Sequence, residues 1–128
     1  MRNYKIEIEI CEGKGGQLQK DGDRIVYPDI VREGICAWMY RGDGETSYQV
    51  GQRFSYPQDM GKICPWLLDS MHNMIHVLRC GGTLPWRYAS TPYEKQFDED
   101  GVTTEFVRCV DPTESGIVVK VIRTELPG

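Results

Sequence analysis

The segment from Pro65 to Gly82 most constrains the fold, because it predicts one helix with a defined start and a defined end. Proline suits the first helical position, where its missing N–H leaves no hydrogen bond unmade, and paired glycines are typical of the position just beyond a helix. Placing residues at about 100° intervals separates an apolar stripe from a polar one. The apolar stripe is Leu67, Met71, Met74, Ile75 and Leu78, and the polar one is Asp69, His72, His76 and Cys80. The sequence therefore predicts one main amphipathic helix over about 65–80.

The rest of the chain has the periodicity of strands. Tyr4, Ile6, Ile8 and Ile10 alternate with charged residues, as in a strand with one buried face. Strands are also predicted at 48–56, 102–110 and 117–123, the last a β-branched run suited to a central strand. Loops are predicted at 13–22, where Asp21-Gly22 is a turn dipeptide able to join hairpin arms, and at 41–45. Strands, one helix and further strands indicate an α+β fold, a small mostly antiparallel sheet packed against one main helix.

Length and composition indicate a single globular domain over residues 1–128. A chain of 128 residues is long enough for one modest core. Its 40% hydrophobic and 27% charged residues are ordinary globular usage, which argues against a largely disordered chain.

Charge and hydropathy exclude two classes of partner. Fifteen Lys and Arg against nineteen Asp and Glu give a net charge of −4 without a basic run, so the electrostatic attraction that drives nucleic-acid binding is missing. No apolar run reaches the roughly 20 residues that span a bilayer, and residues 1–10 alternate in polarity where an export signal would be continuously apolar. We therefore expect a cytoplasmic protein that binds neither nucleic acid nor membrane.

Five cysteines need an explanation other than disulfides, because without an export signal reduced thiols are the default. No Cys-x-x-Cys occurs, so a metal site would have to combine residues distant in sequence. If the helix begins at Pro65, Cys64 is its N-cap, where free N–H groups and the positive end of the helix dipole favour a thiolate. The alternative is a small buried cap residue with an inert thiol.

Two histidines provide further candidate ligands. His72 and His76, four residues apart on one helix face with Asp69 one turn earlier, have a spacing at which two imidazoles can share a metal. The alternative is an ordinary exposed polar face, and no glutamate lies between them as in a zinc-protease helix. Cys64 and Cys80 lie about 24 Å apart along an intact helix, so they cannot share one metal or one disulfide.

All three tryptophans stand in short glycine-, cysteine- or proline-containing phrases. These are Gly34-Ile35-Cys36-Ala37-Trp38, Gly61-Lys62-Ile63-Cys64-Pro65-Trp66 and Gly81-Gly82-Thr83-Leu84-Pro85-Trp86. The third phrase combines a helix stop with a rigid turn that positions an aromatic ring. That ring either lines a pocket or caps the core, and we favour core capping.

The order of these elements resembles a family. It consists of Gly34-x-Cys36, Val50-Gly51-x-x-Phe54, Gly61-Lys62-Ile63-Cys64-Pro65-Trp66, Gly81-Gly82-x-x-Pro85-Trp86 and Cys109-x-Asp111-Pro112. Over about 34–123 it is similar to a family of small uncharacterised proteins found mostly in anaerobic bacteria and archaea. The chain departs from that pattern in lacking the histidine that typically follows the first cysteine. The resemblance implies a compact α+β domain and singles out Cys36, Cys64 and Cys109 as motif cysteines, without an established activity.

Three functional hypotheses follow. The first is an accessory subunit or interaction module of a larger enzyme system, with a protein partner or a second copy of the chain as its target. A candidate partner surface consists of Trp38, Trp66, Gly81, Gly82, Pro85, Trp86 and Asp111.

The other two hypotheses place chemistry at the cysteines. In one, Cys36, Cys64 and Cys109, completed by His72 or His76, bind zinc or iron, which soft thiolates favour. In the other, Cys64 is the thiolate of a cysteine-dependent enzyme, activated by the helix end.

Overall fold

The computed structural model describes residues 3–14, 19–26, 34–36, 38–39, 48–112 and 117–127. The loop predicted at 41–45 lies outside these ranges. In the described ranges, no helix combines the length and the apolar character needed to cross a membrane.

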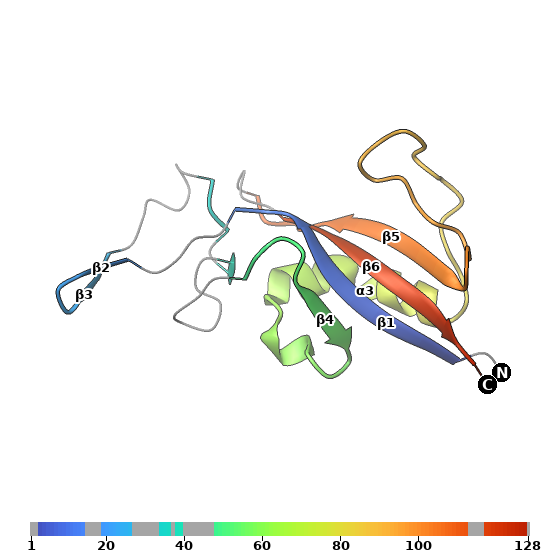
Figure 1. Ribbon diagram of the computed structural model, residues 1–128, viewed down its shortest axis with the longest axis horizontal. Coiled ribbons are helices and arrows are strands. Elements are labelled where there is room, and N and C mark those ends of the chain that lie inside the picture. The colour runs from blue at the N-terminus through green and yellow to red at the C-terminus, as the bar shows by residue number, and fades with distance from the viewer. Residues whose placement is uncertain are drawn as a thin grey trace.

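The described chain forms a four-stranded sheet, a two-stranded hairpin and one main helix (Figure 1). The elements in chain order are β1 (Asn3–Glu12), β2 (Gln19–Asp21), β3 (Arg24–Val26), β4 (Arg53–Tyr56), the short 3₁₀ helix η1 (Met60–Lys62), α3 (Pro65–Arg79), β5 (Val102–Arg108) and β6 (Val118–Leu126). The sheet has the order β4-β1-β6-β5 and all its neighbours are antiparallel. Helix α3 packs on one face of this sheet, which confirms the predicted α+β fold.

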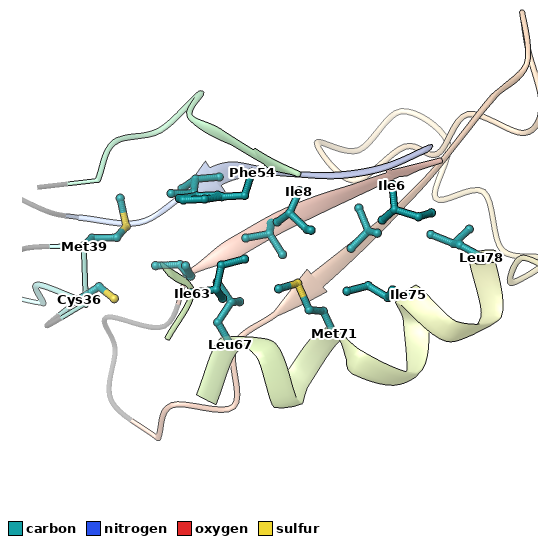
Figure 2. Packing of buried hydrophobic residues seen from close by; sticks show 14 residues of the cluster. Ile6, Ile8, Cys36, Met39, Phe54, Ile63, Leu67, Met71, Ile75 and Leu78 are labelled. Carbon is teal, nitrogen blue, oxygen red and sulfur yellow. The ribbon is translucent and has the colours of Figure 1, made fainter. Parts of the chain in front are cut away.

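The core lies between β1 and α3 (Figure 2). Successive side chains of a strand point to opposite faces, so the alternation predicted for β1 places Ile6, Ile8 and Ile10 toward the helix, where each is at most 3% exposed. From α3 the buried side chains are Leu67, Met71, Ile75 and Leu78. The predicted stripe is confirmed at these four positions, whereas Met74, at its margin, is only partly buried.

Strand β6 occupies the centre of the sheet, as its β-branched sequence predicts. Val119 and Val121 belong to the core that β1 and α3 share. Val118 and Ile122 point to the other face and are buried there too. A strand buried on both faces does not alternate between buried and exposed positions, which is why this segment is almost continuously apolar.

Both predicted helix ends are confirmed. Cys64 is the N-cap and Pro65 the first residue of α3, while Cys80 is the C-cap and Gly81 follows with φ of 87°. Arg123 of β6, 6% exposed, donates from its guanidinium to the carbonyl oxygens of Leu78 at 3.0 Å and Gly82 at 2.9 Å. A cation at the negative end of a helix is stabilising, so the central strand holds the C-terminus of α3.

After α3 the chain follows the outer edge of β5. We call residues 83–101 the edge loop. Its Gln96 carbonyl accepts from the Thr104 amide at 3.0 Å, and the Thr104 hydroxyl accepts from the Gln96 amide at the same distance. The Asp98 amide donates to the Thr103 hydroxyl at 2.9 Å. These bonds cover an edge strand that would otherwise offer unpaired backbone groups to another chain.

The strand boundaries differ from the predictions in three places. In the predicted strand 48–56 only β4 is regular, because Gly51 turns the chain with φ of 95°. Within the predicted loop 13–22, Gln19–Asp21 forms β2 and pairs with β3, so the hairpin exists. Strand β5 ends at Arg108 and β6 runs on to Leu126, where its pairing with β1 continues.

Candidate functional site

The first motif cysteine, Cys36, lies at one end of the core, near Ile63 and Leu67 (Figure 2). It is 8% exposed, and its amide donates to the Lys14 carbonyl at 2.8 Å. The backbone N–H groups of Trp38 and Met39 both donate to its sulfur. Backbone donors aimed at one sulfur favour its thiolate form, although burial acts in the opposite direction.

Cys64, the second motif cysteine, caps the N-terminus of α3 and is partly buried. Its carbonyl accepts the first helical hydrogen bond, from Leu68 at 2.9 Å. Its side chain makes no capping hydrogen bond, so the sulfur is not committed to the backbone N–H groups of the first turn. Those N–H groups and the helix dipole place a positive partial charge beside it.

The third motif cysteine, Cys109, follows β5 directly and is partly buried. Its amide donates to the Ile117 carbonyl at 2.8 Å, which fixes the backbone against the start of β6. Its sulfur accepts from the Asp111 amide and lies beside the Ser70 hydroxyl. Asp111 thus contributes a backbone donor to this sulfur.

The three motif cysteines are distant in sequence but lie within electrostatic range of one another. Burial chiefly raises the pKa of the Cys36 thiol, and negative charge on Cys64 and Cys109 raises it further. Burial likewise raises the pKa of Cys109, with Cys64 again contributing. The three sulfurs are therefore close enough for charge on one to disfavour charge on the next, and Cys36 and Cys109 are neutral thiols at pH 7. We call Cys36, Cys64 and Cys109 the thiol cluster.

The described side chains do not form a ready-made metal site. Among them, no group of three or more His, Cys, Asp or Glu is arranged to hold a metal ion. His72 and His76 are exposed on the outer face of α3, about 12 and 18 Å along the helix axis from Cys64 at 1.5 Å per residue. The three cysteines lie within electrostatic range of one another without forming a ligand set, and both histidines lie farther along α3.

The predicted partner surface divides into packing residues and exposed residues. The Trp38 ring contacts the Tyr48 ring at a tilt of 35°, with centroids 4.6 Å apart. Its indole N–H donates to the Lys62 carbonyl at 2.9 Å, so Trp38 packs within the fold. Gly81 and Gly82 serve the end of α3. Exposed side chains in this set are those of Trp66, Pro85 and Trp86.

The interpretation of Trp86 as a core cap is wrong, because its side chain is 57% exposed. The chain is fixed to the edge of β5 two residues earlier, where the Leu84 amide donates to the Glu105 carboxylate at 2.9 Å. From there the edge loop leads away from the core, and more than half of the Trp86 side chain is exposed to solvent.

Sequence reasoning missed Ser70. Its hydroxyl donates to the Trp66 carbonyl at 2.8 Å and accepts from the Val110 amide at 2.9 Å. Ser70 thereby ties the first turn of α3 to the segment that carries Cys109. A serine four residues after Trp66 is an ordinary helix pattern, and nothing in it indicates the distant partner.

The fold and the site together define a small α+β domain with a cluster of three cysteines at the N-terminal end of its main helix. Comparison of the chain with protein-family models, with curated proteins and with solved structures finds no match.

Proposed function

We propose that the thiol cluster binds a soft metal ion, zinc or iron. The observation that supports this proposal is that Cys36, Cys64 and Cys109, from three separate segments, lie within electrostatic range of one another near the N-terminal end of α3. Thiolates are the preferred ligands of these metals. A shared cation would turn the mutual repulsion of three thiolates into attraction.

The surroundings of the sulfurs suit a bound cation. The metal would displace the thiol protons, so binding releases protons and overcomes the raised pKa of Cys36 and Cys109. The Trp38, Met39 and Asp111 amides, which already donate to sulfur, would stabilise the thiolate charge. Because the sulfurs are not in a ready-made ligand arrangement, binding requires the three cysteines to move closer together.

Cobalt substitution tests the proposal. Protein purified without oxygen is titrated with Co²⁺, and the near-ultraviolet sulfur-to-cobalt charge-transfer band is recorded. We expect an intense band that Zn²⁺ abolishes, and a much weaker one in each of Cys36→Ser, Cys64→Ser and Cys109→Ser. Cys80→Ser is the matched control, because Cys80 is exposed at the other end of the same helix. A weak band in the native protein, or equal effects of all four substitutions, would refute metal binding at the cluster.

A second candidate function is association through an apolar surface beside the cluster. Trp66 is 55% and Val110 59% exposed, and Ser70 joins their backbones. Large exposed apolar side chains that lie together mark interaction sites. A single small patch of this kind is suited to a two-fold contact with a second copy of the chain, in which each tryptophan meets the other patch.

Sedimentation equilibrium tests this association. We expect a dimer whose dissociation constant rises at least tenfold in Trp66→Ser. Trp86→Ser is the control and should keep the native dissociation constant, since Trp86 lies apart on the edge loop. A monomer over the whole concentration range, or equal effects of the two substitutions, would exclude the dimer.

The third hypothesis was catalysis by Cys64. Neither histidine can act as the base that activates this thiol, because both lie well away from it along α3.

A further inference from the structure

A pocket of about 220 Å³ lies between β5 and the edge loop, apart from the motif cysteines. Its lining residues are Leu84, Tyr88, Tyr93, Lys95, Glu105, Phe106, Val107, Arg108 and Val118. Most of these side chains are aromatic or aliphatic, and a few are charged, which is the usual composition of a small-molecule site.

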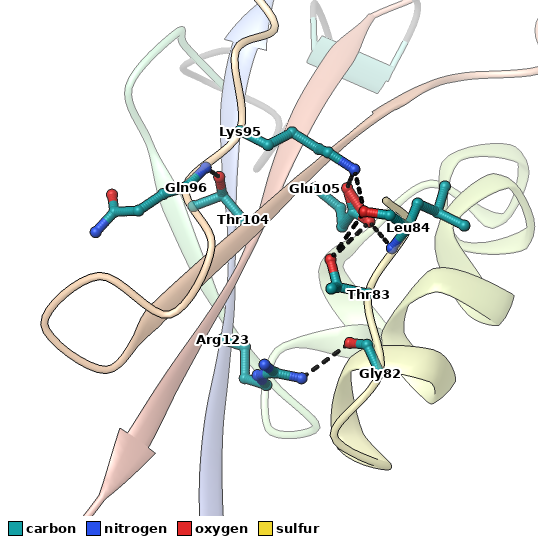
Figure 3. Close-up of polar contacts among 8 residues, drawn as sticks. All are labelled: Gly82, Thr83, Leu84, Lys95, Gln96, Thr104, Glu105 and Arg123. Atoms are coloured by element: carbon teal, nitrogen blue, oxygen red, sulfur yellow. Dashed lines mark hydrogen bonds and ion pairs between the residues drawn. The ribbon is translucent and has the colours of Figure 1, made fainter. Parts of the chain in front are cut away.

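One wall of the pocket is a buried ion pair (Figure 3). The Lys95 ammonium lies 2.6 Å from the Glu105 carboxylate, and each side chain is 2% exposed. Glu105 also accepts from the Leu84 amide at 2.9 Å and the Thr83 hydroxyl at 3.2 Å. Lys95 donates to the Leu84 carbonyl at 2.8 Å. The two charges neutralise each other, so this wall is rigid and has no net charge.

Aromatic rings form the sides of the pocket. Tyr93 and Phe106 meet edge to face, with ring centroids 5.7 Å apart. Tyr88 adds a third ring, 55% exposed, on backbone with φ of 54°. A non-glycine residue in the left-handed region costs free energy and is concentrated at ligand-binding positions. Aromatic faces and edges of this kind pack well against another planar ring.

Arg108 supplies a positive charge at the mouth of the pocket, where the Glu12 carboxylate shares the Tyr93 hydroxyl with it. It is exposed, and among the described residues its guanidinium makes one hydrogen bond, to the Tyr93 hydroxyl at 3.1 Å. That hydroxyl in turn donates to the Glu12 carboxylate, which fixes the ring. Since a guanidinium has five N–H donors, Arg108 retains donors for an incoming anion, and a carboxylate matches their planar geometry.

We propose that this pocket binds a small planar aromatic carboxylate, with its ring between Tyr93, Phe106 and Tyr88 and its carboxylate on Arg108. The volume supports one ring, because an apolar cavity of about 150 Å³ accommodates benzene and this one offers about 220 Å³. A cationic ligand would meet Arg108 with like charge. Of the carboxylates near the pocket, Glu105 is already paired with Lys95, and Glu12 already accepts from the Tyr93 hydroxyl. This proposal is independent of metal binding by the thiol cluster.

Benzoate is the probe, with benzylammonium as the charge-reversed ligand and cyclohexanecarboxylate as the non-planar one. Each is titrated into the full chain while the ring resonances of Tyr93 and Phe106 are followed by NMR. We expect saturable shifts with benzoate, at least tenfold weaker binding of benzylammonium, and weaker binding of cyclohexanecarboxylate. No saturation with benzoate, or equal binding of benzoate and benzylammonium, would overturn the proposal.

Two arginine variants locate the carboxylate. Arg108→Gln should weaken benzoate binding about tenfold, because it removes a charged partner of the carboxylate. Arg53→Gln is the matched control, since Arg53 is also exposed but lies on β4 at the opposite edge of the sheet; it should leave benzoate binding unchanged. Equal effects of both variants would indicate a general charge effect and refute a carboxylate site at Arg108. Cys64→Ser should bind benzoate as the native chain does, which separates this result from the metal experiment.

Discussion

The ammonium of Lys95 and the carboxylate of Glu105 form an ion pair 2.6 Å long in which neither side chain is more than 2% exposed. Taking two charges out of water is costly, and only close contact with further hydrogen bonds offsets that cost. Here Leu84 contributes both its amide and its carbonyl. The pair therefore joins the edge loop to β5 and fixes the chain that leaves α3.

We predict that Lys95→Met lowers the free energy of unfolding by about 3–5 kcal/mol, because it leaves the Glu105 carboxylate buried without a counterion. The double substitution Lys95→Met with Glu105→Leu should recover most of that loss. Urea unfolding monitored by circular dichroism measures both. The control is Lys62→Met, whose side chain is 65% exposed and whose effect should stay within about 0.5 kcal/mol. A double variant as unstable as the single one would contradict this account.

Arg123 gives a second prediction. Arg123→Met removes the donors to the Leu78 and Gly82 carbonyls. The Leu78 carbonyl keeps the Gly81 amide as a donor at 3.0 Å, and a buried carbonyl left unsatisfied costs about 1–3 kcal/mol. We therefore expect a loss of about 1–3 kcal/mol in urea unfolding. Amide exchange should accelerate most in the last turn of α3, which distinguishes loss of the helix cap from general destabilisation. Exchange that speeds up equally over the whole sheet would argue against a capping role.

Two glycines form a matched pair for a third prediction. A Cβ at Gly13, where φ is 152°, would lie 2.4 Å from the Met39 sulfur and 2.5 Å from Ile117 Cγ2, whereas a Cβ at Gly61 meets nothing within 4 Å. Gly13→Ala should cost about 1–3 kcal/mol by overpacking. Gly61→Ala should change the stability by less than about 0.5 kcal/mol. Thermal and urea unfolding compare the two variants, and similar midpoints would be evidence against the close approach at Gly13.

The pKa of Cys36, raised chiefly by burial above its ordinary value of 9.0, gives a pH-dependent prediction. A group whose pKa is raised by folding stabilises the fold below its unfolded pKa, and that contribution is lost as pH rises through the folded pKa. The native chain should therefore lose more stability than Cys36→Ala between pH 7 and about pH 10. Urea midpoints at both pH values measure the difference. An equal loss in both proteins would mean that Cys36 does not titrate in this way.

The rate of alkylation at pH 7 tests whether the Cys36 thiol is buried and neutral. Cys80, which is exposed, should react with iodoacetamide first, and Cys36, which is buried and neutral, should react last. Peptide mass spectrometry over time gives the order. Early labelling of Cys36 in the folded chain would contradict its burial.

Local signals account for what the sequence could predict. Pro65 and Gly81 mark the ends of α3 because proline and glycine act on their own backbone, and the alternation of Ile6, Ile8 and Ile10 reports one buried face. The ion pair of Lys95 with Glu105 could not be predicted from the sequence. Both residues are ordinary surface types, and only the tertiary fold brings them together.

For the motif cysteines too, local structure could be predicted from the sequence, whereas tertiary contacts could not. The N-cap position of Cys64 follows from Pro65, so it could be predicted. That Cys36 and Cys109 approach it depends on where three segments cross at one end of the core, which no spacing encodes. The resemblance to family motifs predicted that Cys36, Cys64 and Cys109 form one group, but it predicted nothing about how they are arranged.

The central position of β6 has a consequence for how the chain folds as it is made. Its register pairs Leu126 with Asn3, so β1 emerges from the ribosome more than a hundred residues before its main partner. Until β6 arrives, β1 has only β4 beside it, and both β1 and β5 present open edges toward the gap. The sheet is completed in its middle by its last strand, which makes folding slow and leaves the nascent chain open to pairing with other chains in the meantime.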